Sequence, residues 1–381
     1  MMNLALLGFG VVGSGVYELC QSRSDIVVKR VLLRSDKPRV AHIATHDMAH
    51  ILGDSSIDTV VEVMGGLHPA YEYVTAALRA GKNVVTANKA LIAAFYEELI
   101  ALAAEYGVAL RCTAAVGGGI PWLTSLERVR RLDTVTQVGG IMNGTSNFIM
   151  DAMHRSPVDF GEILARAQAL GYAEADPSAD IDGDDIRRKL VISANVAFDA
   201  LIAEEAIPMF GIRTVTAGDI AAFQKHGFVC KLLADAALNG DSISASIMPT
   251  LVEEHELEAA VPANFNLITY TGEAIGRQSF YGQGAGKLAT ASNVLQDCID
   301  ILSGRKSFYT GKMVPMSVDN SVEARPCYIR TNAPDAWLRE HTAETWENGA
   351  VITAAVTTRE VLNWAKAQLR KDSGCFIAAI R

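Results

Sequence analysis

The chain has 381 residues, of which 50% are hydrophobic and 20% charged, and this predicts a globular protein of two or three domains. Its formal net charge of −9 at pH 7 and its lack of any dense Lys/Arg block predict no nucleic-acid partner and no anionic membrane surface as a partner. The absence of a bilayer-length apolar run and of a basic leader with a cleavage site predicts a cytoplasmic protein that binds small polar ligands.

The first motif is LALLGFGVVGSGVYELC, where an apolar strand pattern leads through three glycines into a helical pattern. In this context the GxGxxG string predicts a dinucleotide-binding turn; the alternative is a strand, turn and helix without a ligand. Gly8 permits the tight turn, Gly10 lets backbone N–H groups approach a pyrophosphate, and Gly13 lets helix and strand pack closely. The residues predicted to bind the cofactor here are Gly8, Phe9, Gly10, Val11, Val12 and Gly13.

The second strand pattern, IVVKRVLLR, ends at Arg34, where an enzyme that prefers NAD commonly has a carboxylate for the ribose 2′-hydroxyl. Arg34 and Lys37 therefore predict a site for a 2′-phosphate, and we expect NADP to be preferred over NAD. Asp36 is the competing feature, because it lies near enough in sequence to serve an NAD ribose.

Further strand–helix units follow, with helices expected at residues 69–80 and 90–106. This alternation predicts a doubly wound parallel Rossmann sheet, whose ligands gather at the carboxyl ends of the strands. Lys89 could orient a carbonyl and donate a proton there, and its alternative is a surface lysine. The candidate cofactor residues at these strand ends are Met64, Gly65, Thr86, Asn88 and Lys89.

The spacings of the histidines and of the cysteines are two patterns that could indicate a metal site. His42, His46 and His50 recur every four residues, but without a suitable further ligand they predict a half-exposed connecting helix. The six cysteines are widely spaced without a CxxC pair, which predicts buried free thiols.

The second half of the chain begins with QVGGIMNGTSNFIMDAM, a strand pattern that runs through a polar turn into a helix. Thr145 or Ser146 is expected to cap this helix, and its N–H groups would suit a carboxylate ligand. The alternative is an ordinary capped helix.

The stretch GYAEADPSADIDGDDIRRK is densely acidic. An EF-hand with Gly183 at its sixth position would have Ser178 first and Lys189 twelfth, which excludes that calcium loop. A helix starting here places Asp185 and Lys189 one turn apart, either as a surface ion pair or as part of a clamp for a substrate ammonium group beside a proton donor.

Taken together, GFGVVG, TANKALIA, AAVGGGIP, GIMNGTSNFIM, GYAEADPSADIDGDDIRRK and YGQGAGKLATASNVLQD resemble the homoserine dehydrogenase family over about residues 3 to 320. The resemblance implies a homodimer that interconverts L-homoserine and L-aspartate 4-semialdehyde, for threonine and methionine biosynthesis, with a nicotinamide cofactor. It implies that Lys189 donates the proton and that Lys89 aligns cofactor and substrate. The substrate-binding residues are then Glu174, Asp185, Asp180, Asn143, Gly144 and Thr145, and Gly284 approaches the cofactor.

Two other classes of function remain open: another NAD(P)-dependent dehydrogenase of an amino-acid or sugar aldehyde, and a catalytically silent nucleotide sensor. The first shares the glycine motif but does not explain NGTSNFIM together with GYAEADP. The second would not require Lys89, Lys189, Glu174 and Asp185 all to be present.

The sequence departs from the family pattern at Thr113, where the family commonly has a Glu that helps to bind a monovalent cation. The carbonyl groups of Val116, Gly118 and Ile120 match the other ligands of that cation. We therefore expect sodium or potassium to be bound only weakly.

The tail is the second departure. Helices are expected for PDAWLREHTAETW and TTREVLNWAKAQLRK, and strands for AVITAAV and CFIAAIR. The rhythm is similar to an ACT-type regulatory module but short, so the tail is either a degenerate module of that type or a structural appendage.

The expected domains are a dinucleotide-binding domain (1–138 plus about 290–320), an α+β substrate-binding, catalytic and dimerisation domain (139–289), and a small C-terminal αβ module (321–381).

Overall fold

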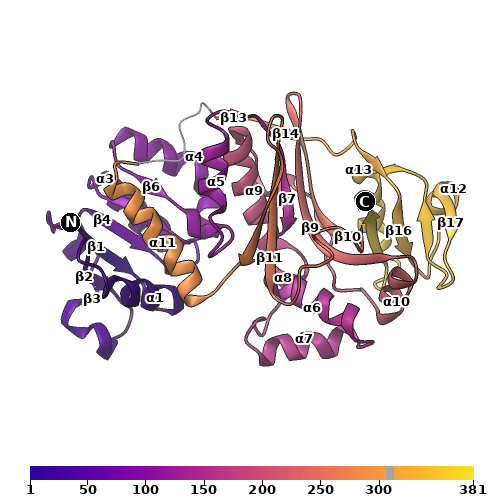
Figure 1. Cartoon of the computed structure of the whole chain (residues 1–381), viewed down its shortest axis with the longest axis horizontal. Coiled ribbons are helices and arrows are strands. Elements are labelled where there is room, and N and C mark those ends of the chain that lie inside the picture. The colour runs from indigo at the N-terminus through magenta and orange to yellow at the C-terminus, as the bar shows by residue number, and fades with distance from the viewer. Residues whose placement is uncertain (306–312) are drawn as a thin grey trace. The chain divides into compact units, whose positions relative to one another are not determined.

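The computed structural model describes residues 1–305 and 313–381 and divides the chain into two compact units (Figure 1). Within the described residues, no helix is both long enough and apolar enough to cross a membrane. All six cysteines are buried thiols, as predicted. Unit 1 comprises Met1–Leu132, Asn195–Leu201 and Gly282–Met313, and unit 2 comprises Asp133–Ala194, Ile202–Tyr281 and Val314–Arg381.

Unit 1 is built on a parallel sheet in the order β3-β2-β1-β4-β5-β6. Its central strand β1 (Met2–Leu7) is a nearly continuous apolar run, which is typical of a parallel strand covered on both faces. The strand order reverses between β1 and β4, where doubly wound sheets bind ligands. The predicted Rossmann sheet is confirmed. The other strands are β2 (Ile26–Leu32), β3 (Ala44–Thr45), β4 (Thr59–Glu62), β5 (Asn83–Thr86) and β6 (Leu110–Arg111).

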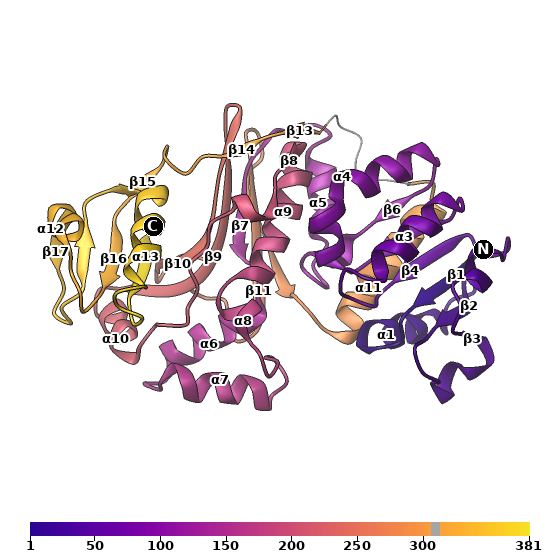
Figure 2. The ribbon, with the colours of Figure 1, turned by 180° about the vertical axis from the view of Figure 1, so that it is seen from behind.

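Two pairs of helices pack within unit 1 (Figures 1 and 2). α1 (Val11–Cys20) lies beside α11 (Lys287–Leu302), and α3 (Ala70–Arg79) lies beside α4 (Lys89–Glu105). Val16 of α1 and Val294 of α11 are fully buried in one apolar cluster with residues of β1 and β2. The remaining elements of unit 1 are the 3₁₀ helices η1 (Pro38–Ile43) and η2 (Thr113–Ala115), the helices α2 (Ala49–Leu52) and α5 (Trp122–Val129), and the short strand β8 (Ala200–Leu201).

The helix predicted over His42, His46 and His50 is wrong. The three histidines fall in η1, after the edge strand β3, and in α2, because Ala44 and Thr45 pair with β2. Sheet pairing therefore overrides the helical spacing, and the imidazoles do not share one helix face. Among the described residues, no group of three His, Cys, Asp or Glu side chains could hold a metal ion.

Unit 2 contains a mixed sheet in the order β12-β11-β7-β9-β10-β20-β16-β18-β17, with β14 also paired to β10. Its centre is the long antiparallel pair β9 and β10, which join at Asn239 and Ser242. An apolar cluster that includes Ile141 and Leu267 supports the neighbouring pair β7 and β11. These strands are β7 (Val135–Ile141), β9 (Phe228–Asn239), β10 (Ser242–Glu253), β11 (Phe265–Gly272), β12 (Gly276–Gln283) and β14 (Ser317–Val318).

Helices α6 and α10 contact strand β9, and α7 packs on α6. α7 ends before Gly171, whose φ of +74° closes the helix as the sequence predicts. α9 begins at Asp184, so that Asp185 and Lys189 lie one turn apart, also as predicted. The helices and remaining short elements are α6 (Gly144–Arg155), α7 (Phe160–Ala169), α8 (Ser178–Ile181), α9 (Asp184–Phe198), α10 (Ala217–Lys225), η3 (Glu204–Ala206), β13 (Val314–Pro315), β15 (Ala324–Arg325) and β19 (Val356–Thr357).

The tail extends the sheet of unit 2, because β20 pairs with β10 (Figures 1 and 2, yellow). Apart from the short strands β15 and β19, which pair with each other, its order of elements is β-α-β-β-α-β, that of the ferredoxin-like motif. The helix predicted through Trp346 is too long: α12 ends at His341 and the next residues form β17, which pairs with β18. The tail elements are β16 (Cys327–Arg330), α12 (Ala336–His341), β17 (Thr342–Thr345), β18 (Val351–Thr353), α13 (Thr358–Gln368) and β20 (Phe376–Ile380).

Candidate functional site

A pocket of about 630 Å³ lies in unit 1 at the reversal of strand order. Of the residues that the sequence predicts for the cofactor, the pocket is lined by Gly8, Phe9, Gly10, Arg34, Lys37 and Met64. Lining residues that the sequence did not single out for the cofactor are Leu32, Leu33, Ser35, His46, Val63, Pro69 and Tyr73.

The glycine turn has a separate physical reason at each position. Gly8 has a φ of +100°, which L side chains rarely adopt. A Cβ on Gly13 would overlap with the carbonyl oxygen of Gly8, so the helix can pack on the turn only when residue 13 is glycine. A Cβ on Gly10 would meet no protein atom within 4 Å, so the fold itself leaves the space beside Gly10 open. That open space, beside the first N–H groups of α1, suits a pyrophosphate.

A buried carboxylate fixes the backbone at Met64, one of the residues that line this pocket. Glu62, at the end of β4, accepts hydrogen bonds from the Met64 and Gly65 N–H groups at 2.7 and 3.2 Å and from the Thr86 hydroxyl at 2.5 Å. Burial raises the pKa of Glu62, and these donors oppose the rise. The predicted residues Gly65 and Thr86 are therefore tied to one side chain that the sequence analysis missed. No local signal marks Glu62, because it reads as part of the strand VVEV.

Asn88 continues this network. Its side-chain amide donates to the Gly66 carbonyl at 2.6 Å, and its Oδ1 caps helix α4 by accepting from the Leu91 N–H at 3.1 Å. Lys89, the first residue of α4, is half-buried. The structure therefore places Thr86, Asn88 and Lys89 together at the carboxyl end of β5, where the sequence predicts ligand contacts.

Four titratable side chains lie around the end of β2, those of Arg34, Asp36, Lys37 and His46. Arg34 and Lys37 line the pocket together with His46. His46 bonds the Leu33 carbonyl through Nδ1 at 2.9 Å and the Asp36 carboxylate through Nε2 at 3.0 Å. These two acceptors raise the pKa of His46, the Leu33 carbonyl most strongly. Asp36, the candidate for an NAD ribose, is thus engaged by an imidazole.

In unit 2, Asn143, Asp180, Asp185 and Lys189 form one polar network. The Lys189 Nζ lies 2.7 Å from the Asp185 carboxylate and donates to the Met142 carbonyl at 2.7 Å. The Asn143 side-chain amide donates to Asp185 at 2.9 Å and to Asp180 at 2.7 Å. Lys189 is only 8% exposed and Asp185 only 6%, so this is a buried ion pair and not a solvated helix face.

Burial raises the pKa of Asp180, and the nearby Asp185 carboxylate adds to the rise, whereas the Asn143 amide opposes it. With both carboxyl groups ionised, two carboxylates next to one ammonium group carry an excess of negative charge. A cationic group of a small ligand would compensate that charge.

The cap of α6 differs from the prediction. Asn143 is the N-cap, and its Oδ1 accepts from the Ser146 N–H at 2.8 Å, so the prediction of Thr145 or Ser146 as cap is wrong. The Thr145 hydroxyl instead donates to the Tyr172 carbonyl at 2.6 Å, which ties the acidic loop to the helix. Gly144 has a packing reason, since a Cβ there would lie 2.7 Å from the Asn264 carbonyl oxygen.

The other predicted residues are placed as follows. Glu174 is exposed, and its carbonyl accepts from the Gln168 side chain at 3.1 Å. Val11, at the start of α1, is 67% exposed, and Val12 packs against the core of unit 1. The Gly284 backbone lies against Gly118, where a Cβ would overlap with it. The unit 1 pocket is not lined by Glu174, Val11, Val12 or Gly284.

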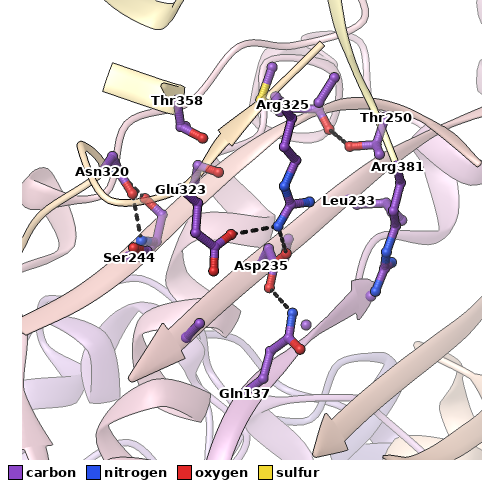
Figure 3. Close-up of a pocket in the computed structure, with 18 of the residues that line it drawn as sticks. Gln137, Leu233, Asp235, Ser244, Thr250, Asn320, Glu323, Arg325, Thr358 and Arg381 are labelled. Atoms are coloured by element: carbon purple, nitrogen blue, oxygen red, sulfur yellow. Dashed lines mark hydrogen bonds and ion pairs between the residues drawn. The ribbon is translucent and has the colours of Figure 1, made fainter. Parts of the chain in front are cut away.

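A further polar pocket lies in unit 2 and is shown in Figure 3. Arg325 lies 2.6 Å from Glu323 and 3.7 Å from Asp235, and the Gln137 amide donates to Asp235 at 2.7 Å. These charges largely compensate one another, and the space of about 50 Å³ has room for a few water molecules rather than for an amino acid. None of the residues predicted for substrate or cofactor lines this pocket.

A Rossmann sheet with a glycine turn, a pocket at the switch of strand order and a buried lysine in a second unit define an NAD(P)-dependent oxidoreductase. Residues 8–112 match the homoserine dehydrogenase NAD-binding domain, and residues 121–299 match the homoserine dehydrogenase family. The chain belongs to the homoserine dehydrogenase family.

Similar proteins agree with this assignment. The homoserine dehydrogenase of Corynebacterium glutamicum is 42% identical over 316 residues, which is 78% of this chain and 71% of that protein. That of Lactococcus lactis is 39% identical over 357 residues, which is 88% of this chain and 83% of that protein. The crystal structure of a homoserine dehydrogenase from Thiobacillus denitrificans superimposes with a TM-score of 0.87 at 28% identity, covering 100% of this chain and 98% of that one.

Proposed function

We propose that the protein is a homoserine dehydrogenase, which interconverts L-homoserine and L-aspartate 4-semialdehyde in the route to threonine and methionine. The observation that carries this proposal is the buried network of Lys189, Asp185, Asp180 and Asn143 in a chain of this family. The ammonium group of a lysine can both stabilise and protonate a developing alkoxide.

The roles of the residues follow from this chemistry. The bound nicotinamide supplies or accepts the hydride at the carbonyl carbon. Lys189 gives its proton to the carbonyl oxygen during reduction and takes it back during oxidation. Asp180 and Asp185 attract the α-ammonium group, and the Asn143 amide fixes the orientation of both carboxylates. Glu174 is proposed as a further ammonium ligand, and Gly144 and Thr145 as part of the helix start that receives the substrate carboxylate.

The cofactor site is proposed to lie on the unit 1 pocket. Gly8, Phe9, Gly10, Val11, Val12 and Gly13 would hold the pyrophosphate, and Met64, Gly65, Thr86, Asn88 and Lys89 would meet the nicotinamide half. Lys89 would align cofactor and substrate, and Gly284 would contribute backbone to the cofactor.

We propose a preference for NADP over NAD. Arg34 and Lys37 line the pocket, and the competing Asp36 carboxylate already bonds His46. Replacing Arg34 by Ala should raise the KM for NADPH about tenfold, the effect expected from loss of a charged hydrogen bond, and should leave the KM for NADH nearly unchanged. Equal Michaelis constants for both cofactors in the unsubstituted enzyme would contradict the preference.

The function is tested by assaying oxidation of homoserine, malate and a panel of sugars with NAD and with NADP. We expect turnover with homoserine alone. Turnover with another alcohol but not homoserine would indicate a different dehydrogenase. Tight binding of nucleotide without turnover of any substrate would indicate a silent sensor.

Assembly, location and the tail are further proposals. We expect a cytoplasmic homodimer, to be checked by sedimentation of the purified protein. For residues 321–381 we propose a structural role without an effector, and clear inhibition by threonine would contradict it. The division into domains at 1–138 plus about 290–320, 139–289 and 321–381 also stays a prediction.

A further inference from the structure

The loop after strand β6 contains the carbonyl groups predicted to hold a weakly bound monovalent cation. Two of them, Gly118 and Ile120, converge on a single group of this chain. The side-chain amide of Asn293, in α11, donates to the Gly118 carbonyl at 2.6 Å and to the Ile120 carbonyl at 2.9 Å. Asn293 is 7% exposed, so water competes little for these bonds.

The position of the amide nitrogen decides what else can bind there. A nitrogen within 3 Å of both oxygens fills the point on which their lone pairs converge. A cation bound to the same two oxygens would overlap with the NH₂ group and would face its positively polarised hydrogens. The amide supplies two donors to two acceptors, so it satisfies both carbonyls without a net charge.

Among the described residues, the carboxylate next to this loop is already bonded to protein groups. The Thr113 hydroxyl donates to Asp297 at 2.6 Å, and the Thr113 N–H donates to the same carboxylate at 2.8 Å. Asp297 also pairs with buried Arg111 at 3.0 Å. Burial raises the pKa of Asp297 to about 6, which still leaves it ionised at neutral pH, and its carboxylate faces Arg111, which also pairs with Asp300 at 2.6 Å. The residues present do not fit a sodium or potassium site.

We propose that the Asn293 side-chain amide is a built-in substitute for a monovalent cation in the loop of residues 113–120. The protein then needs neither sodium nor potassium to hold this loop. The function of the amide is to tie α11 to the loop. The loop conformation is then fixed when α11 packs against α1. Removal of the amide should open the carbonyl groups to an external cation.

The test compares thermal unfolding in KCl, NaCl and tetramethylammonium chloride at equal ionic strength. For the unsubstituted protein we expect one Tm in all three salts. Asn293→Ala should unfold at a lower temperature in tetramethylammonium chloride and recover part of the loss in KCl or NaCl. Should this variant not fold, Asn293→Ser keeps a small polar group at the position and serves the same comparison.

Asn320→Ala is the matched control. Asn320 is also 7% exposed, and its amide exchanges two hydrogen bonds with the backbone of Ala245 at 2.8 and 2.9 Å, in unit 2. Its loss should lower Tm equally in all three salts.

Two outcomes would overturn the proposal. A Tm of the unsubstituted protein that rises only with potassium or sodium would show that a cation binds beside the amide. A loss in both Asn293 variants that no salt restores would show that the amide is an ordinary structural hydrogen bond. Thermal unfolding needs no substrate, so either result is independent of whether the protein oxidises homoserine.

Discussion

The two candidate sites are built from different parts of the polypeptide. The pocket of unit 1 is shaped at Gly8, Gly10 and Gly13 by backbone, and each glycine acts through the side chain that it lacks. The network of unit 2 consists of side chains, and it joins Asn143 to Asp185 across 42 positions of sequence. Replacing one of these glycines therefore adds atoms to the turn. Replacing a side chain of the unit 2 network instead removes a functional group.

The largest expected effect is at Lys189. Lys189→Met keeps most of the apolar stem but removes the proton donor, so kcat should fall at least about 100-fold, the usual range for a general acid. The measurement is steady-state turnover of homoserine, at a temperature where circular dichroism shows the variant to be folded. The partner Asp185 is left buried without its cation, so a lower Tm is also expected.

Lys231→Met is the matched control for this variant. Lys231 is also a buried lysine of unit 2, and it donates to the Asn147 side chain at 3.0 Å and to the Val261 carbonyl at 2.8 Å. Burial lowers the pKa of Lys231 to about 8, and we assign it no part in the reaction. The variant Lys231→Met should have a lower Tm with little change in kcat. Equal kcat losses in the two variants would remove Lys189 from the mechanism.

This contrast explains how much the sequence alone could predict. The glycine turn could be found because strand, turn and helix follow one another within 20 residues. The pair of Asp185 and Lys189 could be found because its two residues are four positions apart, about one helical turn. Both signals are local, and both predicted elements are confirmed.

Apart from the cap of α6, the site features that sequence reasoning missed depend on contacts distant in sequence. Glu62 bonds Thr86 across 24 positions, and Asn293 bonds Gly118 across 175. His46 looked like part of a helical metal motif, yet strand pairing by Ala44 and Thr45 brings it to the pocket. No periodicity contains this information, because tertiary packing selects the partners.

A smaller effect is expected from adding a methyl group to the unit 1 turn. Gly10→Ala meets no protein atom within 4 Å, so Tm should stay nearly constant while the methyl group obstructs the pyrophosphate. We expect the KM for the cofactor to rise about tenfold, equivalent to about 1.4 kcal/mol of binding.

Gly13→Ala should show the opposite pattern, in which stability falls and the cofactor KM changes little. Its Cβ would overlap with the Gly8 carbonyl oxygen, so the strand and helix must move apart. A loss of about 1 to 3 kcal/mol of stability is expected, as for other overpacked positions, measured by denaturant unfolding. An unchanged cofactor KM in Gly10→Ala would place the pyrophosphate elsewhere.

The smallest effect concerns the pH dependence of cofactor preference. His46 lines the unit 1 pocket, and its pKa is raised, so it stays protonated to a higher pH than an ordinary histidine with a pKa of about 6.5. Below its pKa, the His46 cation neutralises Asp36 and leaves Arg34 and Lys37 to attract a 2′-phosphate. Above it, the Asp36 carboxylate is uncompensated and repels that phosphate.

The ratio of the KM for NADPH to that for NADH should therefore rise a few-fold as the pH increases through the raised pKa of His46, above about 6.5. Steady-state kinetics with both cofactors between pH 6 and 9 would measure this ratio, in which pH effects on the shared chemical step cancel. His46→Gln retains hydrogen-bonding capacity without a titrating charge, so its ratio should be flat over the same range. A slope that survives in His46→Gln would assign the titration to another group, and a flat ratio in the unsubstituted enzyme would mean that the 2′ position lies away from Asp36. The pocket of unit 1 would then discriminate between cofactors through Arg34 and Lys37 alone.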